Sequence, residues 1–344
     1  MRVLIPSLRS TSGIDAYAVA LAAGLAAAGH KAVVVDERGD YESSDRRITR
    51  AALRHPRRLP GPLEPFAEWE LQREVRRLAA EREVDGAHAV RPGLAPRGLP
   101  AAITVWDPLA SPVGRYRAAR GRGEHPGTET AYAVVDGFAA RRAKAIVAVT
   151  EAVRHGYGRY GRCELIPPFL PDESVQEPIG VRGRDVVMVA GQLDLERKGL
   201  PLALAAMDRV NEARGGARLL LVGDWIDPGR RAALPEFCEA TGRLSPSEVR
   251  SIFKTAGCCL IPSLWEEFGY AGLEALAARV PVACAPLPAY EGLGGGVFRA
   301  GSRDPADLAA QIEAALDAEP FEFPPQCRAS VAIPRLLALY EEVF

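Results

Sequence analysis

The chain has 344 residues, of which 48% are hydrophobic and 25% are charged, and its 43 basic residues almost balance 44 acidic ones. This length fits two domains of about 100–200 residues each. The composition excludes a disordered or collagen-like chain. A formal net charge of -1 gives no general attraction to a phosphate backbone, so nucleic acid is not expected as a partner.

The longest stretch of low polarity covers residues 16–28. It is shorter than the roughly 20 residues that a helix needs to span a bilayer. The first residues also lack the cationic and apolar zones of a signal peptide. We therefore expect a cytoplasmic protein.

Basic residues exceed acidic ones as far as Leu165, and the reverse holds after it. Arginines gather in two places, at Arg46, Arg47, Arg50, Arg54, Arg57 and Arg58, and at Arg115, Arg117, Arg120 and Arg122. They indicate either a solvated surface in an arginine-rich chain or a face for an anionic acceptor. Peripheral contact with the inner face of an anionic membrane is a further interpretation.

Apolar runs of strand length alternate with longer helical stretches, which is typical of parallel sheets crossed by helices. In the first half the expected strands are residues 3–5, 32–35, 101–105 and 145–149, and the expected helices are 15–28 and 68–83. Gly29 would end the first helix, and Thr150 could cap a further one. The pattern predicts a first Rossmann-like domain over residues 1–165, which we assign to the acceptor.

A proline-rich passage, residues 166–171, breaks this pattern, and we expect residues 166–180 to form a linker. The alternation then restarts, with expected strands at 186–190, 218–222, 258–261 and 280–284 and expected helices at 200–214, 246–256, 271–278, from Asp304 onward, and 329–344. Residues 181–325 are predicted to form a second Rossmann-like domain, and residues 326–344 a helix that returns to the first. Ligands of such sheets bind at the carboxyl ends of the strands, so we expect a cleft lined by both domains.

The most informative stretch is residues 262–277, where a strand end passes through a loop into a helix. The first N–H groups of a helix bind anions. Glu266 and Glu274 would flank a bound phosphate, which they repel unless each binds something else, such as sugar hydroxyls. The arrangement therefore favours a sugar nucleotide. In the alternative, Glu274 only stabilises the helix start through the macrodipole and Glu266 is solvated.

In this stretch the sequence resembles the retaining GT-B glycosyltransferases of glycosyltransferase family four, whose E-x7-E signature Glu266 and Glu274 match. Further matches are Lys198-Gly199 for a K-G phosphate motif, Val-Gly at 222–223, Gly-Arg-Leu-Ser at 242–245, Pro281-Val282 and Glu291. The resemblance spans nearly the whole chain. It is weaker in the first half, where Ser12-Gly13 is similar to a glycine-rich opening loop.

The resemblance implies a GT-B fold, with two Rossmann-like domains facing a central cleft. It also implies transfer of a sugar from a nucleoside-diphosphate sugar, with UDP- and GDP-sugars favoured, to a hydroxyl of a glycoside, lipid or natural product. Lys198 would pair with the donor diphosphate and Glu274 would accept hydrogen bonds from the ribose. Glu266, with the backbone of Phe268 and Gly269, would hold the transferred sugar. Neither a protein nucleophile nor a metal or other cofactor is expected.

Further positions around the donor follow from the same resemblance. Gly13 would let backbone amides approach the diphosphate. The loops at Gly223 and Leu244 would surround the nucleobase. Gln192 stands where the family usually has a phosphate-binding arginine, so a permanent charge is missing. Lys198 is one of only four lysines in the chain, although a stray surface lysine remains an alternative.

Three residues of the first half are further candidates for the site. Trp106-Asp107 stands where the family often has a His-Asp dipeptide. Asp107 could contact the sugar or acceptor, and with Glu266 and Lys198 it is a candidate catalytic residue. Trp106 could stack on a sugar or lie in the core, and His88 could line the acceptor side or be a structural histidine.

Two other functions compete with glycosyl transfer. The departures at Gln192 and Trp106 favour a sugar-nucleotide-binding protein of the same fold that has lost transferase activity. A nicotinamide-dependent oxidoreductase could use the same Rossmann halves. The sequence argues against it, because no G-x-G-x-x-G lies between a strand and a helix, and the glycines at 292–296 precede a strand.

Overall fold

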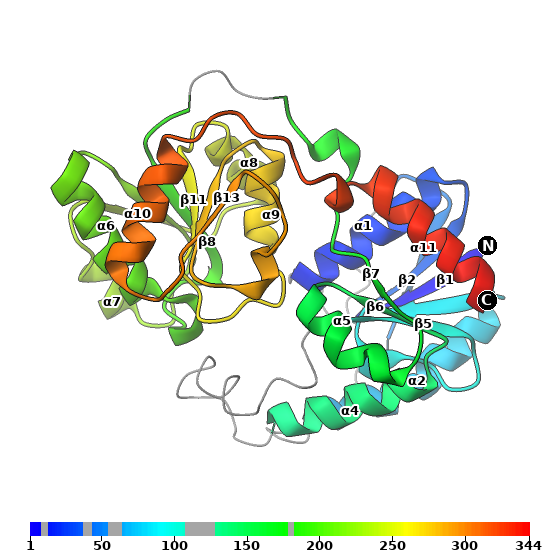
Figure 1. Cartoon of the computed structure of the whole chain (residues 1–344). Coiled ribbons are helices and arrows are strands. Elements are labelled where there is room, and N and C mark those ends of the chain that lie inside the picture. The colour runs from blue at the N-terminus through cyan, green and yellow to red at the C-terminus, as the bar shows by residue number, and fades with distance from the viewer. Residues whose placement is uncertain (8–12, 37–42, 54–63, 107–127, 178–181) are drawn as a thin grey trace. The chain divides into compact units, whose positions relative to one another are not determined.

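The computed structural model describes residues 1–7, 13–36, 43–53, 64–106, 128–177 and 182–344. They form two compact units. The first contains the described residues up to Asp172 together with Gln326–Phe344, and the second contains Glu173–Pro325. Each unit is built around a parallel sheet with helices on both faces, as Figure 1 shows. The predicted α/β class with two Rossmann-like units is confirmed.

The first unit contains, within its described part, a seven-stranded parallel sheet in the order β3-β2-β1-β4-β5-β6-β7. Its strands are β1 (Arg2–Pro6), β2 (Lys31–Asp36), β3 (Ile48–Ala52), β4 (Gly86–Ala89), β5 (Ala101–Val105), β6 (Ala145–Ala148) and β7 (Cys163–Leu165). Its helices are α1 (Gly13–Ala27), α2 (Glu64–Glu81), α4 (Thr128–Arg142), α5 (Glu151–Tyr157) and α11 (Ala329–Val343). Figure 1 shows α1 and the C-terminal α11 on one face of this sheet and α2 and α4 on the other.

The ends of two helices in this unit follow from local chemistry. Gly29 takes the left-handed conformation, with φ at +85°, just after the end of α1. The side chain of Thr150 accepts a hydrogen bond from the amide of Val153 and so caps α5. Both predictions from the sequence are confirmed.

A buried histidine on β4 ties the C-terminal helix to the first sheet. His88 Nδ1 is hydrogen-bonded to the hydroxyl of Tyr340 on α11, and Nε2 lies 2.6 Å from Oγ1 of Thr104 on β5. Burial lowers the pKa of His88 to about 3, so the ring is neutral. Since both ring nitrogens are occupied inside the core, His88 is a structural histidine and does not line an acceptor site.

Trp106 also belongs to the core of the first unit. It follows β5, is 6% exposed, and donates from Nε1 to the carbonyl oxygen of Val90 at 2.7 Å. Its ring meets that of Tyr17 edge-on, with 5.3 Å between the centroids. The structure thus supports the core interpretation of Trp106 and not the stacking platform. Asp107 lies outside the described residues.

The second unit contains a six-stranded parallel sheet in the order β10-β9-β8-β11-β12-β13. Its strands are β8 (Val186–Gln192), β9 (Leu219–Asp224), β10 (Cys238–Gly242), β11 (Cys258–Ile261), β12 (Val282–Cys284) and β13 (Val297–Arg299). Its helices are α6 (Leu200–Arg214), α7 (Pro228–Ala232), α8 (Pro246–Phe253), α9 (Tyr270–Ala277) and α10 (Pro305–Leu316). A capping box begins α8, because the side chains of Ser245 and Glu248 each accept the other's backbone amide.

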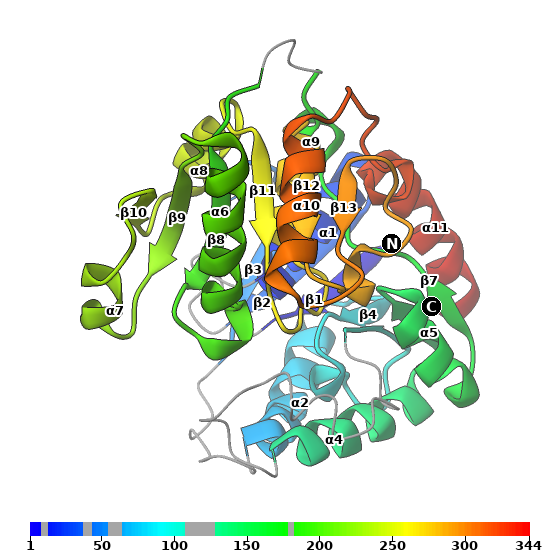
Figure 2. The ribbon, with the colours of Figure 1, turned by 60° about the vertical axis from the view of Figure 1, so that its left-hand side comes forward.

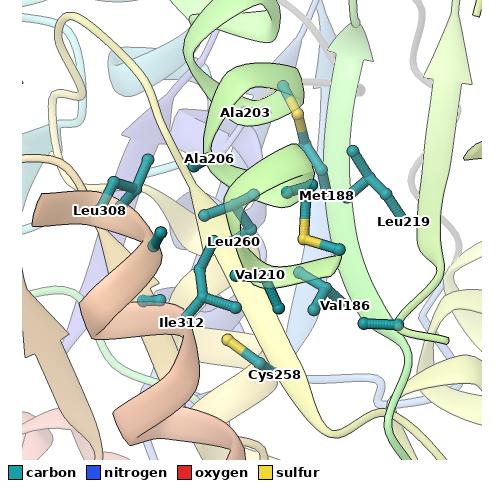
Figure 3. Packing of buried hydrophobic residues seen from close by; sticks show 14 of the residues in the cluster. Val186, Met188, Ala203, Ala206, Val210, Leu219, Cys258, Leu260, Leu308 and Ile312 are labelled. Atoms are coloured by element: carbon teal, nitrogen blue, oxygen red, sulfur yellow. The ribbon is translucent and has the colours of Figure 1, made fainter. Parts of the chain in front are cut away.

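The main core of the second unit lies between its sheet and two helices. In Figure 2, α6 and α10 run side by side over one face of the sheet. Figure 3 shows the side chains that fill this layer, which include Val186 and Met188 from β8, Leu260 from β11, Val210 from α6 and Ile312 from α10. Packing them away from water fixes the strand ends from which the functional loops leave.

None of the helices in the described ranges is both long enough and apolar enough to cross a membrane.

The buried histidine predicts an acid-sensitive first unit. In the unfolded chain a histidine binds its proton near pH 6.5, whereas His88 in the folded protein does so only near pH 3. Its contribution to the free energy of unfolding is therefore lost as the pH falls from 6.5 to 3. Between pH 7 and pH 4.5 this loss is about 2.5 kcal/mol. Urea unfolding of the wild type and of His88→Gln at both pH values measures the difference. Equal pH dependence in the two proteins would contradict it.

Candidate functional site

The strand order of the second unit brings two loops together. From the neighbouring strands β8 and β11 the strand order runs outward in opposite directions, through β9 and β10 on one side and β12 and β13 on the other. The pair β8 and β11 is therefore the topological switch point of the sheet. Open parallel sheets bind their ligands at such a switch point. Residues 193–199 follow β8 and residues 262–269 follow β11. The two loops carry Lys198 and Glu266, which the sequence assigned to one site.

The two loops are packed directly against each other. The amide of Leu264 donates to the carbonyl oxygen of Arg197 at 2.8 Å. Gly199 has φ at +70°, and a Cβ on it would overlap the carbonyl oxygen of Pro262. The guanidinium of Arg303 donates to the carbonyl oxygen of Leu264 at 2.6 Å. The K-G dipeptide therefore needs its glycine for the close approach of the second loop.

Lys198 and Glu266 form an ion pair across these loops. Lys198 Nζ donates to Glu266 Oε1 at 2.6 Å, and the hydroxyl of Ser263 donates to the same oxygen at 2.6 Å. The two charged side chains are 15% and 12% exposed. A pair this poorly solvated is costly to break by removing one partner, because the other charge is left uncompensated. A ligand that binds here must therefore replace the partner of each.

The helix α9 begins directly after the Glu266 loop. Gly269, with φ at +84°, is its N-cap and supplies no capping side chain. Phe268 is 2% exposed and anchors the loop, meeting the ring of Tyr270 edge-on at 6.4 Å. The N–H groups of a first helical turn lack partners within the helix and carry the positive end of its dipole. This end of α9 can accept an anion next to the ion pair.

Glu274 projects from α9 and is partly buried. Burial raises its pKa, and the positive charge of Arg250 on α8 acts in the opposite direction. A carboxyl group shielded from water in this way is suited to accept hydrogen bonds from neutral hydroxyls. Glu266 in the loop and Glu274 in α9 thus belong to one continuous loop–helix segment.

A third carboxylate, which the sequence did not single out, joins the loops after β8 and β9. Asp194 is 7% exposed, and its two oxygens accept the amides of Ile226 at 2.9 Å and Asp227 at 2.7 Å. Burial raises the pKa of Asp194, but the hydrogen bonds from backbone amides together with the positive charge of Arg230 outweigh it, and the pKa is lowered. The loop after β9 is therefore held beside the loop that carries Lys198.

Three of the remaining candidates belong to β8, to β9 and to the loop before α8 in the second unit, and the fourth belongs to the first unit. Gln192 is the last residue of β8 and is exposed. Gly223, with φ at +149°, is buried near the end of β9, where a Cβ would overlap the backbone of the neighbouring strand. Leu244 is partly buried just before α8. Gly13 begins α1 of the first unit and is exposed.

The packing of the loops predicts different effects of alanine at the two ends of α6. Gly199 and Gly215 flank this helix, and both have positive φ, but only Gly199 faces another backbone. Gly215→Ala should cost about 1–2 kcal/mol through its positive φ alone, because no atom lies within 4 Å of the added Cβ. Gly199→Ala should cost about 2–4 kcal/mol, because the overlap with Pro262 adds to that strain. Urea unfolding of the two variants checks this, and equal losses would contradict the close packing of the loops.

Two family models match most of the chain. The model of Glycosyltransferase Family 4 matches residues 11–174, and that of Glycosyl transferases group 1 matches residues 184–318. A glycogen synthase of Mycobacterium tuberculosis is 31% identical over 143 residues, which are 38% of this chain and 34% of that protein. The match thus spans about a third of the length of this curated relative.

Solved structures share the fold over nearly the whole chain. Sucrose-phosphate synthase from Thermosynechococcus elongatus has a TM-score of 0.71 at 18% identity, covering 99% of this chain and 96% of that one. The structure of trehalose-6-phosphate from E. coli bound with UDP-2-fluoro glucose has a TM-score of 0.65 at 12% identity, covering 100% of this chain and 95% of that one. With the family models, these likenesses confirm the resemblance seen in the sequence: the chain belongs to glycosyltransferase family four and has the GT-B fold.

Proposed function

We propose that the protein is a retaining glycosyltransferase that moves a sugar from a nucleoside-diphosphate sugar to a hydroxyl of an acceptor. The observation that carries the proposal is the 2.6 Å ion pair of Lys198 and Glu266 at the switch point of the second sheet. It places an ammonium suited to a diphosphate against a carboxylate suited to sugar hydroxyls. A donor that contains a diphosphate and sugar hydroxyls can pair with the ammonium of Lys198 and the carboxylate of Glu266 at once.

Donor binding exchanges the partners of the ion pair. The diphosphate takes the ammonium of Lys198 and the first N–H groups of α9. The hydroxyls of the sugar take the carboxylate of Glu266, and the ribose hydroxyls take Glu274. Each group that loses a partner gains another, so no charge is left buried and unpaired. A nucleoside diphosphate without its sugar would leave the Glu266 carboxylate unpaired beside an anion, which favours product release.

The same groups assist the reaction. As the bond between the anomeric carbon and the diphosphate oxygen breaks, negative charge grows on the leaving group, and Lys198 with the start of α9 stabilises it. The acceptor oxygen attacks the face that the diphosphate leaves and passes its proton to a diphosphate oxygen. The configuration is retained without a protein nucleophile or a metal. Because Gln192 is uncharged, Lys198 supplies most of the positive charge that stabilises the leaving diphosphate.

We assign the other parts of the donor, and the acceptor, to the remaining candidate residues. The nucleobase is assigned to the loops at Gly223 and Leu244. A UDP-sugar is the first donor to test, because a structure of the same fold was solved with UDP-2-fluoro glucose. Gly13 and Asp107, in the N-terminal unit, are assigned to the diphosphate and to the acceptor side, where a glycoside, lipid or natural product would bind.

Transfer activity should depend on Lys198 and Glu274. A thermal-shift panel of UDP-, GDP-, ADP- and dTDP-sugars first identifies the donor, since a ligand that binds only the folded state raises the melting temperature. With that donor and a panel of acceptors, Lys198→Ala and Glu274→Ala should each lower kcat/KM by about 100-fold or more. The control is Lys254→Ala, which removes an exposed lysine of the same unit.

The products decide between transfer and binding alone. The proposal predicts release of the nucleoside diphosphate and a glycoside with the anomeric configuration of the donor. Near-normal rates in Lys198→Ala or Glu274→Ala would remove the proposed site. Binding of a donor without release of its diphosphate, with any acceptor, would instead favour the binding protein.

Glu266→Gln should separate binding of the nucleotide from transfer of the sugar. The amide keeps the size of the side chain but removes the charge that neutralises Lys198. The affinity for the free nucleoside diphosphate should rise several-fold, and kcat/KM for the nucleotide sugar should fall by about 100-fold. Calorimetry and steady-state kinetics measure the two effects. Parallel losses of both would show that Glu266 only supports the loop.

A further inference from the structure

Tyr290 reaches the start of α9 from a different part of the chain. It ends a short 3₁₀ turn, Pro288–Tyr290, that follows β12, and it is 2% exposed. Its hydroxyl donates to the carbonyl oxygen of Gly269 at 2.8 Å. The backbone of Gly272 is hydrogen-bonded to the same phenol. The hydroxyl thus contacts the residues that begin and end the first turn of this helix.

Two glycines make room for the phenol. A Cβ on Gly269 or on Gly272 would overlap the hydroxyl of Tyr290. The N-cap residue of α9, Gly269, supplies no capping side chain. An oxygen that bonds the amide of the third helical residue is the usual contribution of a capping serine or aspartate. The phenol of Tyr290 occupies that role from outside the segment.

The charge of Glu266 also acts on the phenol of Tyr290. Burial raises the pKa of Tyr290 well above its usual range, and the negative charge of Glu266 raises it further. The phenol therefore keeps its proton and remains a donor to Gly269. The phenol thus bonds the start of α9 and lies within the electrostatic influence of the carboxylate that holds Lys198.

We propose that Tyr290 is a positioning residue of the donor site, whose hydroxyl holds the first turn of α9 so that the start of the helix faces the diphosphate beside Glu266. The inference rests on the proposed function. Tyr290 itself is buried and acts on the donor only through the helix. The phenol fixes the direction of the amides, while Lys198 and Glu266 supply the charges.

The test compares two substitutions that each remove one buried hydroxyl. Tyr290→Phe breaks the contacts with α9, and Tyr340→Phe breaks the bond to His88 in the other unit. Hydrogen exchange of residues 269–273 in the ligand-free protein reports the cap. Calorimetry with UDP, or the diphosphate that the thermal-shift panel favours, reports the site. Tyr290→Phe should speed this exchange at least fivefold and weaken binding about tenfold, and Tyr340→Phe should change neither.

The outcomes separate this inference from the proposed function. If the wild type binds the diphosphate and Tyr290→Phe matches it in affinity and exchange, Tyr290 has no positioning role although the function stands. The same holds if both variants weaken binding equally, since the effect then follows general stability. If the wild type binds no nucleoside diphosphate, the proposed function and this role of Tyr290 both fail. Gly272→Ala places a Cβ where the hydroxyl of Tyr290 lies. It should therefore speed the exchange of residues 269–273 and weaken binding of the diphosphate, as Tyr290→Phe does.

Discussion

An ion pair between Lys198 and Glu266 holds a cation and a carboxylate 2.6 Å apart where neither side chain is more than 15% exposed. The pair exists because β8 and β11 are neighbouring strands and the loops that follow them pack against each other at Gly199. In so little water, losing one partner costs more than exchanging it. The site therefore favours a ligand that offers an anion and neutral hydroxyls together, as a nucleotide sugar does.

The residues that support this pair act through the backbone. Arg303 holds the carbonyl of Leu264, Asp194 holds the loop after β9, and Tyr290 holds the start of α9. Each supporting side chain comes from a segment outside the loop that it fixes. Such contacts fix the loops through their backbone and so hold Lys198 and Glu266 in place. The arrangement is that of a preorganised site on a rigid sheet.

The sequence predicts the elements with long apolar runs, such as α6 and β11, whose bounds match the expected ones. It does not predict β3 or β10, because β3 carries Arg50 in its middle and β10 is a partly exposed edge strand. Lys198 and Glu266 are identified from motifs, but their contact, across 68 positions, depends on strand order. The core role of His88 depends on Tyr340, 252 residues away. For Tyr290 the only local signal is Gly269 and Gly272 in a helix turn that lacks a capping side chain.

The exchange of partners at the ion pair is tested most directly by a crystal structure of the protein with the nucleotide sugar that it binds. The ammonium of Lys198 should lie on the diphosphate, and the carboxylate of Glu266 should accept the hydroxyls of the sugar. The first amides of α9 should point at the phosphate oxygens. A donor bound elsewhere, with Lys198 and Glu266 still joined, would contradict the exchange and the function built on it.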